Sequence, residues 1–381
     1  MKFVEELSES SIIDHYQYIK KGKIHHLLPI LGIATILRVT NLGVSVRPDE
    51  PVSVYEFGQI PVGQIVVRIS ELDPHPPLYY ILLRIWMEVI GHSIVIARLL
   101  SVLMGLVAVV GMYLLGREFG SHRIGLTAAL IVTFSPFHIA NAQTARMYPL
   151  FTSAILFSTM FLMRLSFNRA ESKRDWIGYI LSTGVLISTH LYGIFVFGGQ
   201  ILSHIILWRL SFGKKKFFRQ FKRSGRWFGG ALLISLPTIA IMFRTVLLRI
   251  QTGGGDVSHA NPPTLKYLAL TAGLFAGGES GLIPAALLLL VASALTLRQI
   301  TEFPVRSLLP LGIAIGTVVP PVLISFILFS IWDGRSALGA WLMVELLSAA
   351  GYWIFSKRVR YFFAGLWAVA TIALMATYYN I

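Results

Sequence analysis

Residues 94–116 read IVIARLLSVLMGLVAVVGMYLLG, an apolar run interrupted by a single charge at Arg98. A helix of about 20 residues crosses the hydrocarbon core of a bilayer, so this stretch is long enough to span a membrane. Similar runs recur along the chain. They are continuous rather than alternating, which favours a helical bundle over an outer-membrane barrel. The sequence therefore predicts an all-α fold, that of a polytopic helical membrane protein.

The composition supports the same class. Of the 381 residues, 55% are apolar and 13% are charged, and the mean hydropathy is +0.69. A soluble protein carries about 25% charged residues, so the composition argues against a water-soluble enzyme. The chain has no cysteine, which excludes disulfides, cysteine-bound zinc and thiol catalysis. We attribute the net charge of +15 to cytoplasmic loops and predict no nucleic-acid partner.

We predict a bundle of about eleven transmembrane helices. They lie near residues 27–44, 94–116, 124–140, 150–166, 176–192, 194–210, 227–248, 281–297, 307–331, 337–355 and 361–379. Two stretches, 51–69 and 77–91, are too short or too polar to span comfortably, so we predict two interfacial helices in the first outer loop. Pro76 and Pro77 suit the first turn of the second one.

The basic residues orient this bundle. With residues 1–26 as a cytoplasmic N-terminal segment, 23 of the 33 Lys and Arg fall in cytoplasmic loops, and the largest cluster runs from Arg209 to Arg226. The first extracytoplasmic loop is then 45–93, and the segments near 141–149 and 249–280 also lie outside. We predict one transmembrane domain over 27–381 with no C-terminal soluble domain, in the cell (plasma) membrane.

Polar side chains gather at the predicted outer face. A single buried His or Arg is more often structural, whereas several that converge on one face of a membrane domain indicate a site. The candidates occur where the predicted outer segments meet the spans: Asp49, Glu50, His75, Arg146, Tyr148, His190, Tyr192 and Arg335.

Taken in order, short motifs over residues 30–200 resemble a known family. The pieces are Leu37-Arg38, Asp49-Glu50, Asp73-Pro74-His75-Pro76-Pro77-Leu78-Tyr79-Tyr80, Ala97-Arg98-Leu99-Leu100-Ser101, Leu115-Gly116-Arg117, Ser135-Pro136-Phe137, Ala145-Arg146-Met147-Tyr148 and Thr189-His190-Leu191-Tyr192-Gly193. This pattern resembles the GT-C glycosyltransferases that use polyprenyl-phosphate-linked sugars, including protein O-mannosyltransferases and lipid A aminoarabinose transferases. Two features depart from it: Ser336 follows Arg335 where relatives often have Tyr, and many relatives add a soluble domain after the last span.

The resemblance implies a GT-C-like bundle with an extracytoplasmic active site. It also implies a polyprenyl-phosphate-linked sugar donor and an acceptor hydroxyl on a protein, glycolipid or glycan. Such a donor carries its own leaving group, so one carboxylate suffices to take the acceptor's proton. We assign this general base to Asp49, which matches the family's catalytic aspartate, and we expect an inverting transfer. Glu50 is a second catalytic candidate, for orientation or for a metal.

The departing phosphate needs positive charge aimed at it. We expect His75, Arg146, His190 and Arg335 to supply that charge, with Tyr148 and Tyr192 against the sugar or lipid. Tyr79 and Tyr80 are further candidates for this packing. No cofactor is certain. No His, Asp and Glu spacing is a metal signature, although a divalent metal ion at Asp49, Glu50 or His190 is compatible with these side chains.

A transporter or a lipid or glycolipid flippase is the main alternative, and a non-catalytic scaffold is a third. A transporter predicts charges near the bilayer midplane and interrupted helices in corresponding halves. Glu345 is the only acidic residue that we place deep in a span. Pro320-Pro321 is the clearest internal break, and it has no counterpart elsewhere.

Overall fold

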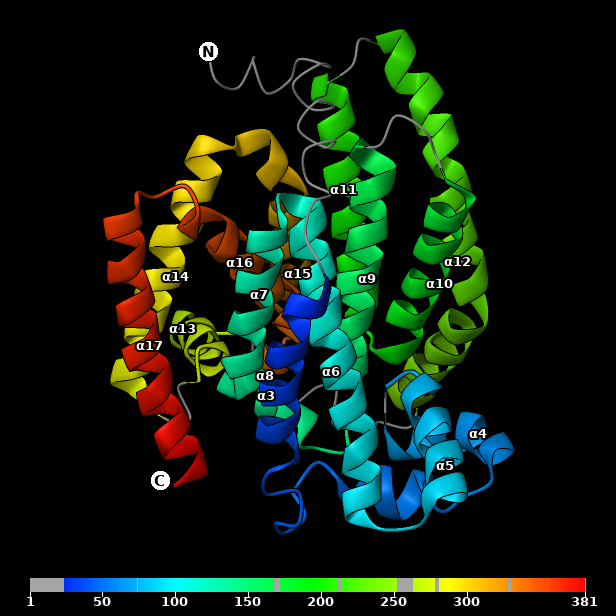
Figure 1. The fold of residues 1–381 in the computed structure, drawn as a ribbon. Coiled ribbons are helices and arrows are strands. Elements are labelled where there is room, and N and C mark those ends of the chain that lie inside the picture. Colours follow the sequence, from blue (N-terminus) through cyan, green and yellow to red (C-terminus); the bar gives the residue numbers. More distant parts are fainter. Residues whose placement is uncertain are drawn as a thin grey trace.

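The computed structural model describes residues 24–73, 75–167, 172–211, 214–251, 263–277, 281–327 and 330–380. Within these residues every regular element is a helix, which confirms the predicted all-α class (Figure 1). The first half holds η1 (Ile24–Leu27), α3 (Leu28–Val39), η2 (Val52–Phe57), α4 (Val62–Leu72), α5 (Leu78–Ile90), α6 (Ile94–Phe119), α7 (His122–Phe134), α8 (Pro136–Ala142), α9 (Tyr148–Phe167) and α10 (Lys173–Thr189). The second half holds α11 (Gly193–Ser211), α12 (Lys214–Gln251), α13 (Leu265–Phe275), α14 (Leu282–Glu302), α15 (Pro304–Ile327), η4 (Gly334–Ala337), α16 (Leu338–Tyr352) and α17 (Lys357–Tyr379).

Each predicted span coincides with a helix or a pair of helices. Among the described helices, α6, α9, α11, α12, α14, α15 and α17 are long and apolar enough to cross a membrane. Helices α7 and α8 pass the same test only as a bent pair, and the apolar helices α3 and α16 are shorter. The protein is therefore a multi-pass membrane protein, while the count of eleven spans stays a prediction.

The span predicted over 124–140 is not a single straight helix, because the helix breaks at Ser135. Helix α7 ends at Phe134, α8 begins at Pro136, and the two are bent by 65°. Ser135 has φ −71° and ψ 116°, the extended conformation that a following proline favours. The bend directs α8 toward the polar segment that precedes α9.

Three further details differ from the sequence prediction. Pro320 and Pro321 do not interrupt a helix, because α15 is continuous from Pro304 to Ile327. The interface helix expected over 51–69 is two elements, η2, a turn of π-helix, and α4. The sequence prediction also missed α13, which lies in the expected outer segment 249–280.

Helix α9 lies inside the bundle and α17 at its edge. In the most apolar 18-residue window of each, 72% of residues are buried in α9 and 17% in α17. Helix α6 packs against α7 and α9, and α11 packs against α15. Glycines bring these backbones into contact: a Cβ on Gly116 would lie 2.9 Å from the Cα of Gly125, and one on Gly316 would lie 2.6 Å from the Cα of Gly199.

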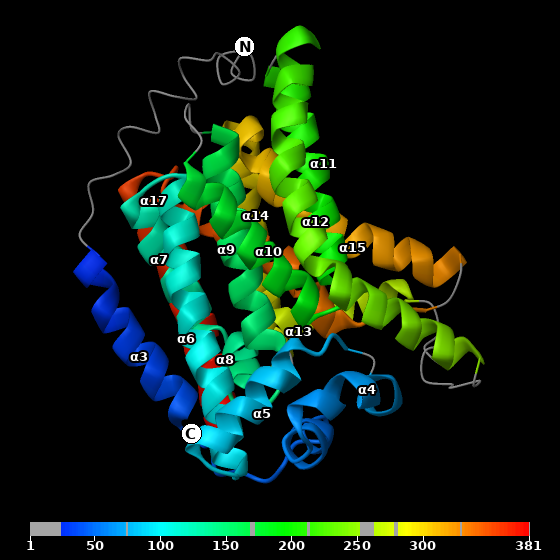
Figure 2. The same ribbon diagram turned by 90° about the vertical axis from the view of Figure 1, so that its right-hand side faces the viewer.

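The described residues between 42 and 91, which we call the loop cap, cover one end of the bundle (Figure 2). The loop cap has its own apolar core, in which Phe57, Tyr80 and Met87 pack with Ala145 and Met147 from the segment just before α9. The ends of α11 and α12 that flank the most basic stretch of sequence lie at the opposite end of the bundle (Figures 1 and 2). The fold therefore separates the loop cap from the basic cluster, as the orientation argument requires.

Candidate active site

A buried ion pair fastens the start of the loop cap to the bundle. The Nε and Nη2 atoms of Arg98 on α6 donate to Oε1 and Oε2 of Glu50 at 2.8 and 2.5 Å. Both side chains are fully buried. Backbone amides complete the carboxylate's partners, because Ala145 N donates to Oε1 and Arg47 N to Oε2, each at 2.8 Å. Burial alone raises the pKa of Glu50, but these hydrogen bonds and the Arg98 charge hold it below its usual range.

Arg98 has no donor left for a ligand. Its guanidinium offers five N–H groups, and the three not aimed at Glu50 donate to the carbonyls of Leu42, Val44 and Ser45 at 2.7 to 3.0 Å. We call Glu50 and Arg98 together the brace. Since both oxygens of Glu50 and all donors of Arg98 are used inside the protein, the brace fixes the loop rather than binding a substrate.

The brace holds Asp49, the predicted base, in a tight turn beside the α8–α9 segment. The turn is closed by the Glu50 amide, which donates to the Arg47 carbonyl at 3.1 Å. Asp49 is half-buried, whereas Glu50 next to it is fully buried. Because Glu50 accepts from Ala145 N, the chain at Asp49 is joined directly to the chain at Arg146.

A second cluster forms where α4 ends. Arg146 Nη1 donates to Oδ2 of Asp73 at 2.9 Å, and the hydroxyl of Tyr80 donates to the same oxygen at 2.8 Å. His75 contacts the other oxygen through its ring Nδ1 and its backbone amide. Asp73 is extended, with φ −155° and ψ 128°, as expected before Pro74. The short proline-rich segment thus turns both Asp73 and His75 toward Arg146.

The charge of Asp73 is stabilised by this arrangement. Burial by itself raises the pKa of its carboxyl group. The hydrogen bonds from His75 and Tyr80, together with the charges of His75 and Arg146, outweigh that effect and hold the pKa well below its usual range. Asp73 is therefore held in its charged form, as the counter-ion of Arg146.

His190 extends the cluster from the end of α10. Its ring lies 4.9 Å from the ring of His75 and 5.8 Å from that of Tyr148, measured between centroids. The backbone amide of Tyr192 donates to its Nδ1 at 3.2 Å. When His190 is neutral, this contact places its proton on Nε2, the nitrogen on the other side of the ring.

Tyr192 links the same corner to the segment before α16. Its hydroxyl donates to the carbonyl of Ile331 at 2.9 Å and accepts from the Asp333 amide at 3.1 Å. Arg335 follows two residues later in η4, and its side chain lies outside the described part of the structure. Of the eight predicted site residues, five therefore meet directly or through one neighbour: His75, Arg146, Tyr148, His190 and Tyr192.

Arg146 retains donor capacity. Its Nη1 also approaches the Ser53 hydroxyl at 3.5 Å. Its Nε is buried without a hydrogen-bond partner among the described residues. A buried guanidinium with one edge satisfied and another N–H unused can bind a further oxyanion, because Arg pairs bidentately with phosphate.

Sequence reasoning did not assign site roles to Asp73 and Arg98, although both lie in motifs that it singled out. The signal for Asp73 is its place before Pro74, because the extended residue turns its carboxylate out of α4. The signal for Arg98 is a lone charge near the start of an otherwise apolar span, which requires a buried partner.

The predicted metal candidates do not form a ligand set. The described residues include no group of three or more His, Asp or Glu side chains arranged to hold a metal ion. Both oxygens of Glu50 are engaged by the brace, and Nδ1 of His190 accepts from a backbone amide.

Comparisons with known proteins agree with this architecture. The family model described as dolichyl-phosphate-mannose-protein mannosyltransferase matches residues 74–241. ArnT from Cupriavidus metallidurans, solved with undecaprenyl phosphate, superposes with a TM-score of 0.60 at 15% identity, over 93% of this chain and 65% of that one. The fold is that of the GT-C membrane glycosyltransferases.

At the level of the fold, these matches agree with the GT-C resemblance read from the sequence motifs. The Archaeoglobus fulgidus oligosaccharyltransferase, solved with Zn and sulfate, gives a TM-score of 0.53 at 16% identity, over 92% of this chain and 52% of that one. This chain spans less than two thirds of the length of either GT-C structure. No curated protein matches the sequence.

Proposed function

We propose that this protein is an integral membrane glycosyltransferase of the GT-C type, which transfers a sugar from a polyprenyl-phosphate donor to an acceptor hydroxyl. The GT-C fold and the mannosyltransferase family model support this class. The observation that carries the proposal is Arg146, a buried guanidinium that is neutralised on one side by Asp73 and has an unused Nε. ArnT, which shares the fold, was solved with a lipid phosphate, undecaprenyl phosphate.

In the proposed reaction the acceptor oxygen attacks the anomeric carbon while the bond from that carbon to the phosphate oxygen breaks. The lipid phosphate leaves with the bonding electrons. Arg146, with His75 and His190 beside it, stabilises the negative charge that develops on the leaving phosphate. Since displacement occurs in one step, the configuration at the anomeric carbon is inverted.

Asp49 takes the proton of the acceptor hydroxyl. A carboxylate in this role needs access to the substrate, and Asp49 is half-buried whereas Glu50 is closed off by the brace. Glu50 acts as a positioning residue, because it ties the turn that carries Asp49 to the segment that carries Arg146. Tyr148 and Tyr192 line the site for the sugar or the lipid, and Arg335 is a further phosphate-binding candidate.

The donor is lipid-linked, so we place the active site on the extracytoplasmic face of the plasma membrane. The separation of the loop cap from the basic α11–α12 end supports this orientation. The acceptor is a hydroxyl of a protein, a glycolipid or a glycan. Among the similar structures, an Archaeoglobus fulgidus oligosaccharyltransferase was solved with an inhibitory peptide and a dolichol-phosphate. A transporter predicts interrupted helices in corresponding halves. Among the described residues only α7 and α8 form such a bent pair, and α15 is continuous through Pro320 and Pro321, so the transporter alternative loses support.

The role of Asp49 is tested by Asp49→Asn in a reconstituted transfer assay with a polyprenyl-phosphate sugar. We expect a loss of turnover of about 10²-fold or more, because the amide cannot accept the proton. Asp175→Asn is the matched control. It lies at the start of α10, near the basic end, where its carboxylate contacts Arg164 at 3.5 Å, and it should keep activity. Full activity of the Asp49 variant would rule out the assigned base.

The orientation is tested separately with an impermeant thiol reagent, since the chain has no cysteine of its own. Val46→Cys introduces a thiol at an exposed position in the loop cap. Arg226→Cys does the same at an exposed position near the basic end. In intact cells we expect labelling of the first variant and not the second. The reverse pattern would place the site on the cytoplasmic side.

A further inference from the structure

The bundle contains a second polar assembly that the proposed reaction does not use. Glu345 lies in the middle of α16, and its Oε2 pairs with Nε2 of His138 on α8 at 3.0 Å. Both side chains are buried. The other carboxylate oxygen, Oε1, has no hydrogen-bond partner among the described residues. A buried carboxylate oxygen without a partner is costly, so a donor is expected at this place.

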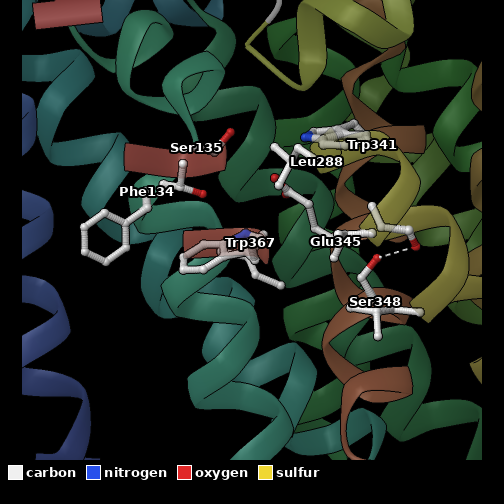
Figure 3. Close-up of a pocket in the computed structure, with 12 residues that line it drawn as sticks. Phe134, Ser135, Leu288, Trp341, Glu345, Ser348 and Trp367 are labelled. Atoms are coloured by element: carbon white, nitrogen blue, oxygen red, sulfur yellow. Dashed lines mark hydrogen bonds between the residues drawn. The ribbon is translucent and has the colours of Figure 1, made fainter. Parts of the chain in front are cut away.

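A cavity lies beside that oxygen. It has a volume of about 40 Å³, lies between α7, α14, α16 and α17 and is partly open to the surface, with Ser135, Trp341, Ser348 and Thr371 among its lining residues. In Figure 3 the Glu345 carboxylate lies between Ser135 and Trp341, while Ser348 turns away to donate to the Ala292 carbonyl.

The same cavity also presents an unused donor. The indole Nε1 of Trp341, one turn before Glu345 on α16, is buried without a hydrogen-bond partner among the described residues. The acceptor Glu345 Oε1 and the donor Trp341 Nε1 both lie on α16. A ligand in the cavity must therefore donate a hydrogen bond to Glu345 and accept one from Trp341. Water meets both requirements. A buried water needs roughly 10–15 Å³, so the cavity has room for about three.

A second, smaller cavity is lined by His138 itself. It has a volume of about 10 Å³ and is also lined by Arg38 of α3. The Nη atoms of Arg38 donate to the carbonyls of Ala34, Val132 and Thr133. Its Nε is buried without a partner in the described chain. This cavity has room for about one water, which can accept from Arg38.

We propose that water occupies both cavities and joins Arg38, His138 and Glu345 in one hydrogen-bonded chain across the membrane domain. The chain links α3 to α16 through α8, so it anchors the helix that leads into the Arg146 segment. This site is separate from the transferase site, and it stands whether or not the proposed reaction is correct.

Radiolytic labelling of the whole protein in water enriched in oxygen-18 tests the proposal. Hydroxyl radicals formed from water in a cavity mark the side chains that line it, and mass spectrometry locates the heavy oxygen. We expect label on Trp341 and His138, although both side chains are shielded from bulk solvent. Absence of label on both residues, at a dose that marks exposed side chains of the loop cap, would overturn the proposal.

Filling the larger cavity provides the matched comparison. Ala292→Leu adds bulk to the cavity wall on α14, whereas Ala294→Leu makes the same change at an exposed position on that helix. We expect Trp341 to lose its label in the first variant and to keep it in the second. Equal labelling in both variants would show that the label does not come from this cavity. If the first variant fails to fold, the wild-type result still decides.

Discussion

Two buried arginines, Arg98 and Arg146, contact the loop cap. Their different surroundings indicate a structural role for the first and a ligand-binding role for the second. Arg98 is fully buried and pairs with Glu50 through two nitrogens. Its remaining N–H groups donate to three backbone carbonyls. Arg146 also has a carboxylate partner, Asp73, but its Nε has no partner among the described residues. A saturated arginine holds the chain in place. An arginine with an unused donor, surrounded by His75 and His190, is available for an anion.

Disrupting the brace should lower the folding stability more than disrupting the Asp73–Arg146 pair. Arg98→Met leaves the Glu50 carboxylate buried without its counter-charge, so we expect a loss of about 3–5 kcal/mol, seen as a lower midpoint of thermal unfolding in detergent. Glu50→Gln combined with Arg98→Met should recover part of the loss, because a neutral amide can still accept from Ala145 N.

Arg84→Met is the matched control for that experiment. Arg84 on α5 is partly buried and its Nε donates to the Ile60 carbonyl at 2.9 Å, but its ion-pair partner Glu88 is 60% exposed. Removing Arg84 therefore leaves no buried charge unpaired and should cost less than Arg98→Met. If Arg98→Met and Arg84→Met unfold at the same temperature, the brace has no special structural role.

Substitution of Asp73 should reduce the folding stability less than loss of the brace does. The partners of Asp73 have some contact with solvent, because the side chain of His75 is 20% exposed and that of Arg146 is 8% exposed. We expect Asp73→Asn to cost about 1–3 kcal/mol at pH 7. The folded pKa of Asp73 lies below its ordinary value of 3.8. Its stabilising effect is therefore fully present above about pH 4 and is lost as the pH falls further.

The corresponding measurement compares the unfolding midpoints of the wild type and Asp73→Asn between pH 7 and pH 3. We expect the difference to stay constant down to about pH 4 and to shrink below it. A difference that disappears already between pH 7 and pH 5 would show that Asp73 is not held as the counter-ion of Arg146.

The sequence predicted the positions of the helices well because apolar runs of span length have few other uses. It failed where one residue decides the local geometry. Pro136 breaks the span expected over 124–140, whereas Pro320 and Pro321 sit inside a helix that neighbouring helices support. Hydropathy also could not detect α13, because its 11 residues are too few for a span.

The candidate site was predicted in part. The order of the motifs brought together His75, Arg146 and His190, because each lies where a predicted outer segment meets a helix. The roles of the individual site residues were harder to predict from the sequence. Asp49 and Glu50 are adjacent in sequence, yet one is half-buried and the other is saturated by Arg98, which is 48 residues away in the chain. Such a contact depends on tertiary packing, which a single sequence does not contain.

The central claim is that Arg146 and its neighbours bind a lipid-borne phosphate. The most direct test is the affinity of the detergent-solubilised protein for a polyprenyl phosphate, compared between the wild type and Arg146→Gln, with Arg84→Gln as the control. We expect the control to bind like the wild type and Arg146→Gln to bind about 10²-fold more weakly, as for the loss of a buried charge partner. Equal affinity of folded wild type and Arg146→Gln would contradict the account.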